Sequence, residues 1–189
     1  MRKVISFVHI SLDGFVAGPN GEMNWIELDE ELFDHISKRI GETDTALYGR
    51  KTYEMMEGYW PTAADKPNAS KHDRDHSAWY KTAEKIVVSK TMAGADLSNT
   101  TVISDNLTES IREIKSGQGS EILLFGSPTT THALMQDNLM DGYWLFVNPV
   151  ILGQGIPLFK NIREKTGLKL VSTRQFTSGV TELSYISSL

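Results

Sequence analysis

The sequence predicts an α/β fold on a mixed sheet with flanking helices, and three observations predict it. Short apolar runs typical of buried strands alternate along the chain with segments of helical periodicity. The last two extended segments, 168–177 and 180–187, are joined by Ser178-Gly179 as an antiparallel hairpin, which excludes an all-parallel sheet. No repeat, low-complexity tract or linker divides residues 1–189, so we expect a single domain.

The strands are justified by their apolar patterns. Residues 3–12 form a nearly unbroken apolar run, which is typical of a central strand covered on both faces. The other strands expected before the hairpin are shorter and lie at 15–17, 45–48, 85–88, 100–103, 122–125 and 143–147.

The helices are expected near 29–41, 49–57, 106–117 and from 128 onward. Asp29 is the expected N-cap of the first helix, and Asn106 and Glu109 are expected to form a capping-box-like pair in the third. Residues 58–80 are polar and contain two prolines, so we expect an irregular loop that acts as a lid, an insertion or a subunit contact.

Composition narrows the class of protein. The net charge of -5 argues against a nucleic-acid surface, and the absence of cysteine excludes thiolate chemistry and disulfides. Polar residues interrupt the first apolar run before it could form a signal peptide or a membrane span, so we expect a cytoplasmic protein. His72 and His76 have the spacing of a helical metal pair, but no third ligand is indicated, and we expect no metal there and a solvated charged face.

Two strand-to-helix turns have the chemistry of an anion site. At the end of 122–125, Gly126 permits a close turn, Ser127 can cap the following helix, and Pro128 suits its first turn. At the end of 45–48, Gly49 is followed by Arg50, Lys51 and Thr52 at a helix start. Free backbone N–H groups at both helix starts favour phosphate, so a ligand with two phosphates is expected, although the first turn is equally compatible with an ordinary strand-to-helix connection.

A large aromatic and several carboxylates lie between the first strands and the first helix. Trp25 follows a polar loop, where it either contacts a ligand or fills the core beneath the loop. The acidic first turn of the helix, residues 29–31, is explained by the helix dipole, and a functional carboxylate is possible among its members.

Six segments in order carry a resemblance to a known family. They are SLDGFVA at 11–17, Trp25, LYGRKTYE at 47–54, IVVSKT at 86–91, EILLFGS at 121–127 and VNPVILGQGIPLF at 147–159. Together they resemble the dihydrofolate reductase-like superfamily, and within it the reductase domain of the bifunctional riboflavin-biosynthesis deaminase-reductase more than dihydrofolate reductase itself. The resemblance implies a three-layer fold whose mixed, mostly parallel sheet has about eight strands, flanking helices and a C-terminal β-hairpin.

The resemblance also implies a cofactor, NADPH, and the residues that hold it. Arg50 matches a position that meets the adenosine 2′-phosphate, and Thr52 one that meets the pyrophosphate. By the same resemblance, Val16 and Ala17 lie beside the nicotinamide. The full set of implied cofactor-binding residues is Val16, Ala17, Gly49, Arg50, Lys51, Thr52, Ser89, Lys90, Gly126, Ser127, Thr129 and Thr130.

The function implied is an NADPH-dependent oxidoreductase, similar to 5-amino-6-(5-phosphoribosylamino)uracil reductase, that transfers hydride to a small heterocyclic substrate. The alternatives are a non-catalytic nucleotide-binding or regulatory protein on this fold, and a dihydrofolate reductase proper. By analogy with the pterin-holding carboxylate of dihydrofolate reductases, Glu30 and Asp29 are candidate catalytic residues and Trp25 a candidate substrate contact. The family suggests a homodimer, with 150–159 or the final hairpin as surfaces.

The chain also departs from the family pattern. It has Gly126-Ser127 followed by Pro128 where the family has a glycine pair, which puts close backbone approach to a phosphate in question. It has no deaminase domain with a zinc motif, so a full bifunctional enzyme is not expected.

Overall fold

An eight-stranded sheet with the order β5-β4-β3-β6-β1-β7-β10-β9 forms the centre of the molecule, a computed structural model that describes residues 1–162 and 164–188. The strands β5 to β7 in this order run parallel, and β10 and β9 add an antiparallel hairpin at one edge. The strand bounds are β1 Val4–Ser11, β3 Thr45–Gly49, β4 Glu84–Val88, β5 Thr100–Ile103, β6 Ile122–Phe125, β7 Gly142–Asn148, β9 Leu168–Gln175 and β10 Thr181–Ser187. The predicted mixed sheet with a C-terminal hairpin is therefore confirmed.

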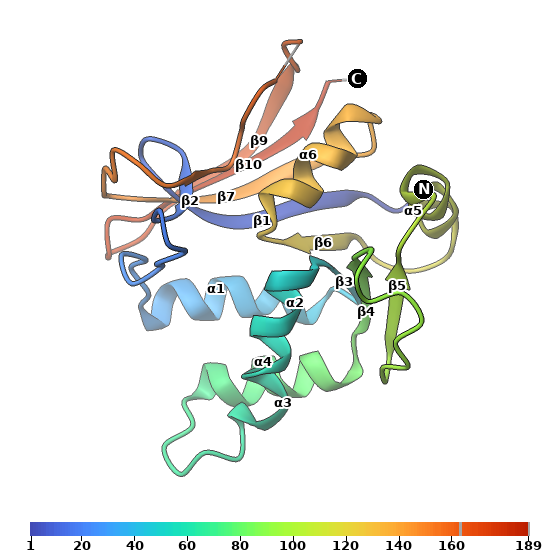
Figure 1. Cartoon of the computed structure of the whole chain (residues 1–189). Coiled ribbons are helices and arrows are strands. Elements are labelled where there is room, and N and C mark those ends of the chain that lie inside the picture. Colours follow the sequence, from blue (N-terminus) through green and yellow to red (C-terminus); the bar gives the residue numbers. More distant parts are fainter. Residues whose placement is uncertain (163, 189) are drawn as a thin grey trace.

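Helices cover both faces of the sheet and make three layers (Figure 1). On one face, α1 (Glu30–Gly41), α2 (Arg50–Glu57) and α4 (Lys71–Thr82) contribute buried side chains to a shared core, and the short α3 (Trp60–Ala63) packs against α4. On the other face lie α5 (Leu107–Ser116) and α6 (Pro128–Gln136). The two cores follow the alternation of β1, since Ile5 belongs to the first core and Val4 and Val8 to the second.

β1 is central, as its apolar run predicts, because it pairs with β6 on one side and β7 on the other. It leads at its carboxyl end into β2 (Phe15–Ala17), which pairs antiparallel with β8 (Ile156–Pro157) in a second, two-stranded sheet. Figure 1 shows these loops gathered at the left, while α5 and the N-terminus lie at the right.

The prediction of an irregular loop over 58–80 is wrong, because this segment contains α3 and most of α4. Ser70 caps α4 in a capping box, in which its Oγ accepts from the Asp73 N–H at 3.0 Å and the Asp73 carboxylate accepts from the Ser70 N–H at 2.9 Å. The helix buries a polar face that includes His76 and Ser77, so an apolar-periodicity criterion misses it. The solvated charged face expected here holds for Arg74 and Asp75 but not for His76, which is 6% exposed.

Two cap predictions have different outcomes. Asp29 caps α1 as expected, with its Oδ1 accepting from the Leu32 N–H at 2.7 Å. Asn106 has a left-handed backbone with φ of 45° and makes no side-chain cap, so the predicted capping box with Glu109 does not form. The final hairpin turns over Phe176 to Gly179 rather than at Ser178-Gly179 alone, since the Gly179 N–H donates to the Phe176 carbonyl.

Candidate functional site

The two predicted anion turns come together at the carboxyl edge of the sheet. A Cβ placed on Gly49, at the end of β3, would lie only 2.1 Å from Oγ of Ser127 and 2.9 Å from Oγ1 of Thr130. A Cβ placed on Gly126, at the end of β6, would lie 3.7 Å from Oγ1 of Thr52. β3 and β6 are neighbours, so their following helices begin side by side and their hydroxyl groups form one cluster.

The first amides of both helices are free of side-chain caps. Gly49 has no side chain to cap α2, and Ser127 does not cap α6, contrary to what its position allows. Instead, Ser127 has a left-handed φ of 47° and its Oγ lies 2.8 Å from Oγ1 of Thr130. Two helix starts without side-chain caps therefore lie next to each other, which is an arrangement that favours phosphate groups.

Basic and hydroxyl side chains lie next to this cluster. Arg50, at the start of α2, is paired with Glu54 one turn later at 2.8 Å, and both side chains are largely exposed. Ser89 is buried at the end of β4, with its Oγ 3.3 Å from Oγ1 of Thr91, and Lys90 is exposed beside it. Because β4 pairs with β3, these groups and Arg50 leave adjacent strands at the same edge.

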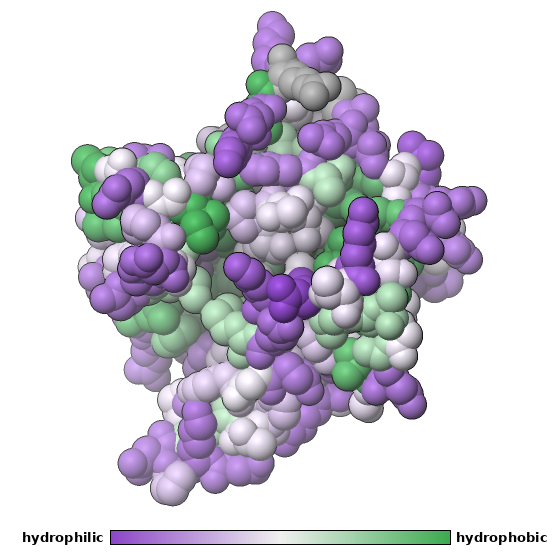
Figure 2. Space-filling view, in the orientation of Figure 1, coloured by the Kyte–Doolittle hydropathy of each residue, from purple (hydrophilic) through white to green (hydrophobic). Residues whose placement is uncertain are grey.

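The remaining predicted cofactor residues flank these. Lys51 and Thr129 are exposed in the first turns of α2 and α6, while Val16 and Ala17 are buried in β2. The sheet order places the ends of β4, β3, β6 and β1 in a row. Three strand spacings span about 14 Å, since neighbouring strands lie about 4.8 Å apart. Figure 2 shows the face with α2 and α6 hollowed between α2 and the loops at the left, with white and green residues around the hollow.

A carboxylate clamp holds the loops beside the end of β1. Asp13 accepts from Oγ of Ser11 at 2.7 Å and from the N–H groups of Leu152 and Gly153 at 3.1 and 2.8 Å. These bonds, that of Ser11 foremost, hold the pKa of the Asp13 carboxyl below its ordinary value. Two of the motifs that carried the family resemblance, SLDG and LGQG, therefore bind each other directly.

β2 packs against the loop that follows β7. A Cβ on Gly155 would lie 2.3 Å from the carbonyl oxygen of Ala17, so only glycine fits there. On the far side, Nε2 of His132 in α6 lies 2.6 Å from the carbonyl oxygen of Leu158. The loop after β7 is thus fixed at both ends, while Ile151 within it is 70% exposed.

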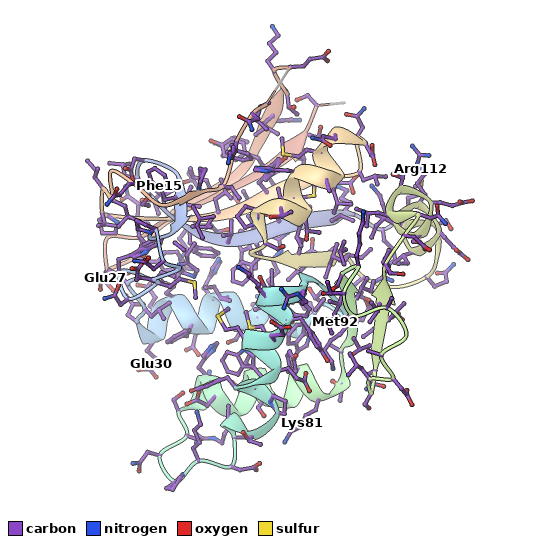
Figure 3. The ribbon with its side chains drawn as sticks, in the orientation of Figure 1. Phe15, Glu27, Glu30, Lys81, Met92 and Arg112 are labelled. Carbon is purple, nitrogen blue, oxygen red and sulfur yellow. The ribbon has the colours of Figure 1, made fainter. Side chains whose placement is uncertain are left out.

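The candidate catalytic carboxylates differ in their surroundings. Both oxygens of Asp29 are used, Oδ1 by the Leu32 N–H and Oδ2 by the Ser178 N–H at 3.2 Å. These contacts, that with Leu32 foremost, lower the pKa of Asp29, so it is ionised at neutral pH and tied to the hairpin turn. Glu30 is exposed in the first turn of α1, on the loop side of the molecule with Glu27 and Phe15 (Figure 3). Trp25 is half-buried, and its indole N–H donates to the Glu22 carbonyl at 3.0 Å.

His9 also lies near the site, and no pattern in the sequence marks its imidazole as functional. His9 lies on β1 opposite Phe146 of β7, and its ring stacks on the Phe146 ring with centroids 5.1 Å apart. Burial lowers the pKa of His9 to about 4, so the ring is neutral at physiological pH. A single histidine within an apolar strand gives no spacing signal, and only the fold places it at the carboxyl edge.

The histidine pair of α4 makes no metal centre in the structure. His72 and His76 have ring centroids 5.5 Å apart, and Nδ1 of His72 lies 3.2 Å from Oγ of Ser37. Within residues 1–162 and 164–188, no group of three or more His, Asp and Glu side chains is placed to hold a metal ion. No helix in the same ranges has the length and apolar character needed to cross a bilayer.

The chain is similar to known proteins over nearly its whole length. The model of the RibD C-terminal domain family matches residues 2–181. Two Bacillus subtilis proteins without an assigned function, YyaP and YwjB, are 32% and 27% identical over 186 residues, covering 97% and 98% of this chain and 94% and 98% of theirs.

Solved structures of lower identity share the fold. A putative riboflavin biosynthesis protein from Shewanella sp. PV-4 superposes with a TM-score of 0.75 at 18% identity, over 99% of both chains. A Thermotoga maritima diaminohydroxyphosphoribosylaminopyrimidine deaminase/5-amino-6-(5-phosphoribosylamino)uracil reductase superposes with a TM-score of 0.68 at 15% identity, over 98% of this chain and 56% of that one.

Proposed function

The chain belongs to the RibD C-terminal domain family, and on this basis we propose that it is an NADPH-dependent reductase of a small heterocyclic compound related to 5-amino-6-(5-phosphoribosylamino)uracil. The predicted dihydrofolate reductase-like fold is the one that the solved relatives share. The substrate assignment rests on the family and on the likeness to the Thermotoga maritima deaminase/reductase.

The observation that carries the proposal is that α2 and α6 both begin without a side-chain cap and begin next to each other, where Gly49 contacts Ser127. Free amides and hydroxyls at adjacent strand ends match a pyrophosphate, and the row of strand ends has the reach of an extended dinucleotide. The glycine at Gly49 is required, because any side chain there would displace Ser127.

Each part of the row has a proposed task. Arg50, Ser89 and Lys90 would hold the 2′-phosphate, for which Arg50 exchanges its exposed pair with Glu54 for a phosphate contact. Thr52, Gly126 and Thr130 would surround the pyrophosphate. Val16 and Ala17, in the small sheet that the Asp13 clamp holds, would flank the nicotinamide.

Bound NADPH supplies the hydride, and this chain's residues supply position and exclusion of water. Asp29, which is ionised and bonded on both oxygens, is unsuited to donate a proton. Glu30, which is exposed, can exchange protons with solvent. Asp29 thus serves as a helix cap, and its neighbour Glu30 faces solvent, so neither is placed like a buried carboxylate that holds a pterin. This favours a riboflavin-type reductase over a folate reductase.

The test is a fluorescence titration of the purified protein with NADPH and, separately, with NADH, followed by turnover assays on pyrimidine, pterin and quinone substrates. Preferential NADPH binding and oxidation with a pyrimidine substrate support the proposal. Tight NADPH binding with no turnover across the panel would identify a non-catalytic nucleotide-binding protein, and turnover of dihydrofolate a folate reductase. Absence of binding to either nucleotide would refute the cofactor assignment.

A further inference from the structure

His9 lies at the place where the sheet opens beside the proposed cofactor site. β6 pairs with β1 only as far as Phe7, and its next residue, Gly126, donates its N–H to the Phe7 carbonyl at 3.0 Å before the chain turns into α6. Two residues further along β1, His9 has β7 on one side, while β6 has already left the other. The His9 side chain shares the α1 face of the sheet with Phe7.

Asn148 sets which ring nitrogen of His9 carries the proton. This amide is fully buried, and its Oδ1 accepts the N–H of Glu27 at 2.8 Å. Its Nδ2 is therefore the donor, and it faces three acceptors: the Phe146 carbonyl at 3.1 Å, the Ile10 carbonyl at 3.4 Å and Nδ1 of His9 at 3.4 Å. A hydrogen on Nδ1 would point at this NH2 group, so Nδ1 is the ring nitrogen that accepts. Because the ring is neutral and Nδ1 accepts, the hydrogen lies on Nε2.

The Nε2–H group is left free to donate. Among residues 1–162 and 164–188 it has no hydrogen-bond partner, and the ring is partly exposed. Phe146 and Phe7 shield the ring, with centroids 5.1 and 6.2 Å from that of His9. A neutral donor between aromatic rings suits the carbonyl oxygen of an uncharged planar heterocycle. A charged imidazolium would instead attract a phosphate group.

We propose that His9 is a substrate-contacting residue, which donates its Nε2–H to a ring carbonyl of the heterocycle. This inference rests on the proposed reductase function and adds the residue that orients the substrate. A polar site of this kind discriminates strongly, because a substrate without the acceptor would leave the donor unpaired. Asn148 is then a positioning residue, since it acts only through the tautomer of His9.

The first experiment needs no turnover. Two-bond ¹H–¹⁵N spectra of the ¹⁵N-histidine-labelled protein should show His9 as the Nε2–H tautomer, with a midpoint near pH 4. Addition of 5-aminouracil to the NADP⁺-loaded protein should shift the Nε2 resonance. A ring that carries its proton on Nδ1, titrates as in solvent, or does not respond to 5-aminouracil overturns the inference.

The second experiment compares variants with 5-amino-6-(5-phosphoribosylamino)uracil as substrate. His9→Phe keeps an aromatic ring against Phe146 but removes the donor, so kcat/KM should fall by about tenfold or more while the NADPH Kd stays unchanged. His9→Gln should restore part of the loss, because its amide N–H can donate. Full activity in a folded His9→Phe variant overturns the inference.

His76→Phe is the matched control, since His76 is also a neutral histidine among aromatic rings but lies in α4. It should leave kcat/KM unchanged, and an equal loss in both variants would assign His9 a structural role. If the wild-type protein reduces none of the substrates, the proposed function fails on its own, and the labelled spectra alone decide whether His9 receives the heterocycle.

Discussion

At the scale of single residues, the site depends on contacts between groups that are distant in the sequence. Gly49 is enclosed by the hydroxyls of Ser127 and Thr130, and Asp13 receives the amides of Leu152 and Gly153. In both cases a small or ionised residue at the end of one strand accommodates the loop that follows another. Substitutions at such positions act on the site without touching any ligand.

Arg50 gives a prediction about cofactor choice. Arg50→Ala should raise the Kd for NADPH by about 10- to 100-fold, because a charge-assisted contact made only to the 2′-phosphate is lost. The Kd for NADH should change by no more than about twofold, since the lost ion pair between Arg50 and Glu54 is exposed and weak. Fluorescence titration measures both constants. Arg112→Ala, on α5 on the other face of the sheet, is the control, and equal losses for NADPH and NADH would move Arg50 to the pyrophosphate.

At the scale of elements, α4 carries a buried histidine on the face that packs against its neighbours. His76 is enclosed by the rings of Trp60 and Trp79, at centroid distances of 3.9 and 5.0 Å, and neither of its nitrogens has a hydrogen-bond partner in the part of the chain that the structure describes. Burial lowers its pKa from 6.5 to about 3, so the folded protein holds the ring neutral. α4 is therefore an element that acid destabilises.

The pH dependence of unfolding tests this. Between pH 6.5 and about 3 the unfolded chain protonates this histidine and the folded protein does not, so stability rises with pH in that window and is lost as pH falls. The contribution is about 1.4 kcal/mol per pH unit. His76→Phe should reduce the slope of the unfolding free energy, measured by urea denaturation at pH 5 and 6.5, and Lys81→Ala, exposed on the same helix, should not. An unchanged slope in His76→Phe would show that α4 opens before His76 titrates.

At the scale of the whole molecule, the positions of most strands along the chain and the two glycine-led turns could be predicted from the sequence, because each rests on local signals. Apolar runs mark the strands, and Gly49 and Gly126 mark the turns after them. Three features could not be predicted in this way. α4 buries polar and aromatic side chains, Asn106 adopts a left-handed backbone in place of a cap, and His9 gains its surroundings only when β1 meets β7. All three depend on tertiary contacts that no single-segment pattern contains.

The family resemblance predicts that the protein forms a homodimer, and this prediction concerns the molecule as a whole. Two surfaces expose apolar side chains: the loop after β7, where Ile151 is 70% exposed, and the edge strand β9, where Val171 is 59% exposed. Light scattering should give twice the 21.1 kDa chain mass. Ile151→Lys and Val171→Lys control for each other, because only the variant at the true interface should give the monomer mass. A monomeric wild-type protein would contradict the expectation.

The central place of β1 also has a consequence for synthesis of the chain. β1 ends at Ser11, but its neighbours β6 and β7 begin at Ile122 and Gly142. At ribosomal rates of about 5 to 20 residues per second, this apolar strand waits on the order of ten seconds for its first partner. During that interval a chaperone or the nascent chain itself must cover it. A slow stretch of translation before residue 122 should therefore increase aggregation, whereas one after residue 148 should not.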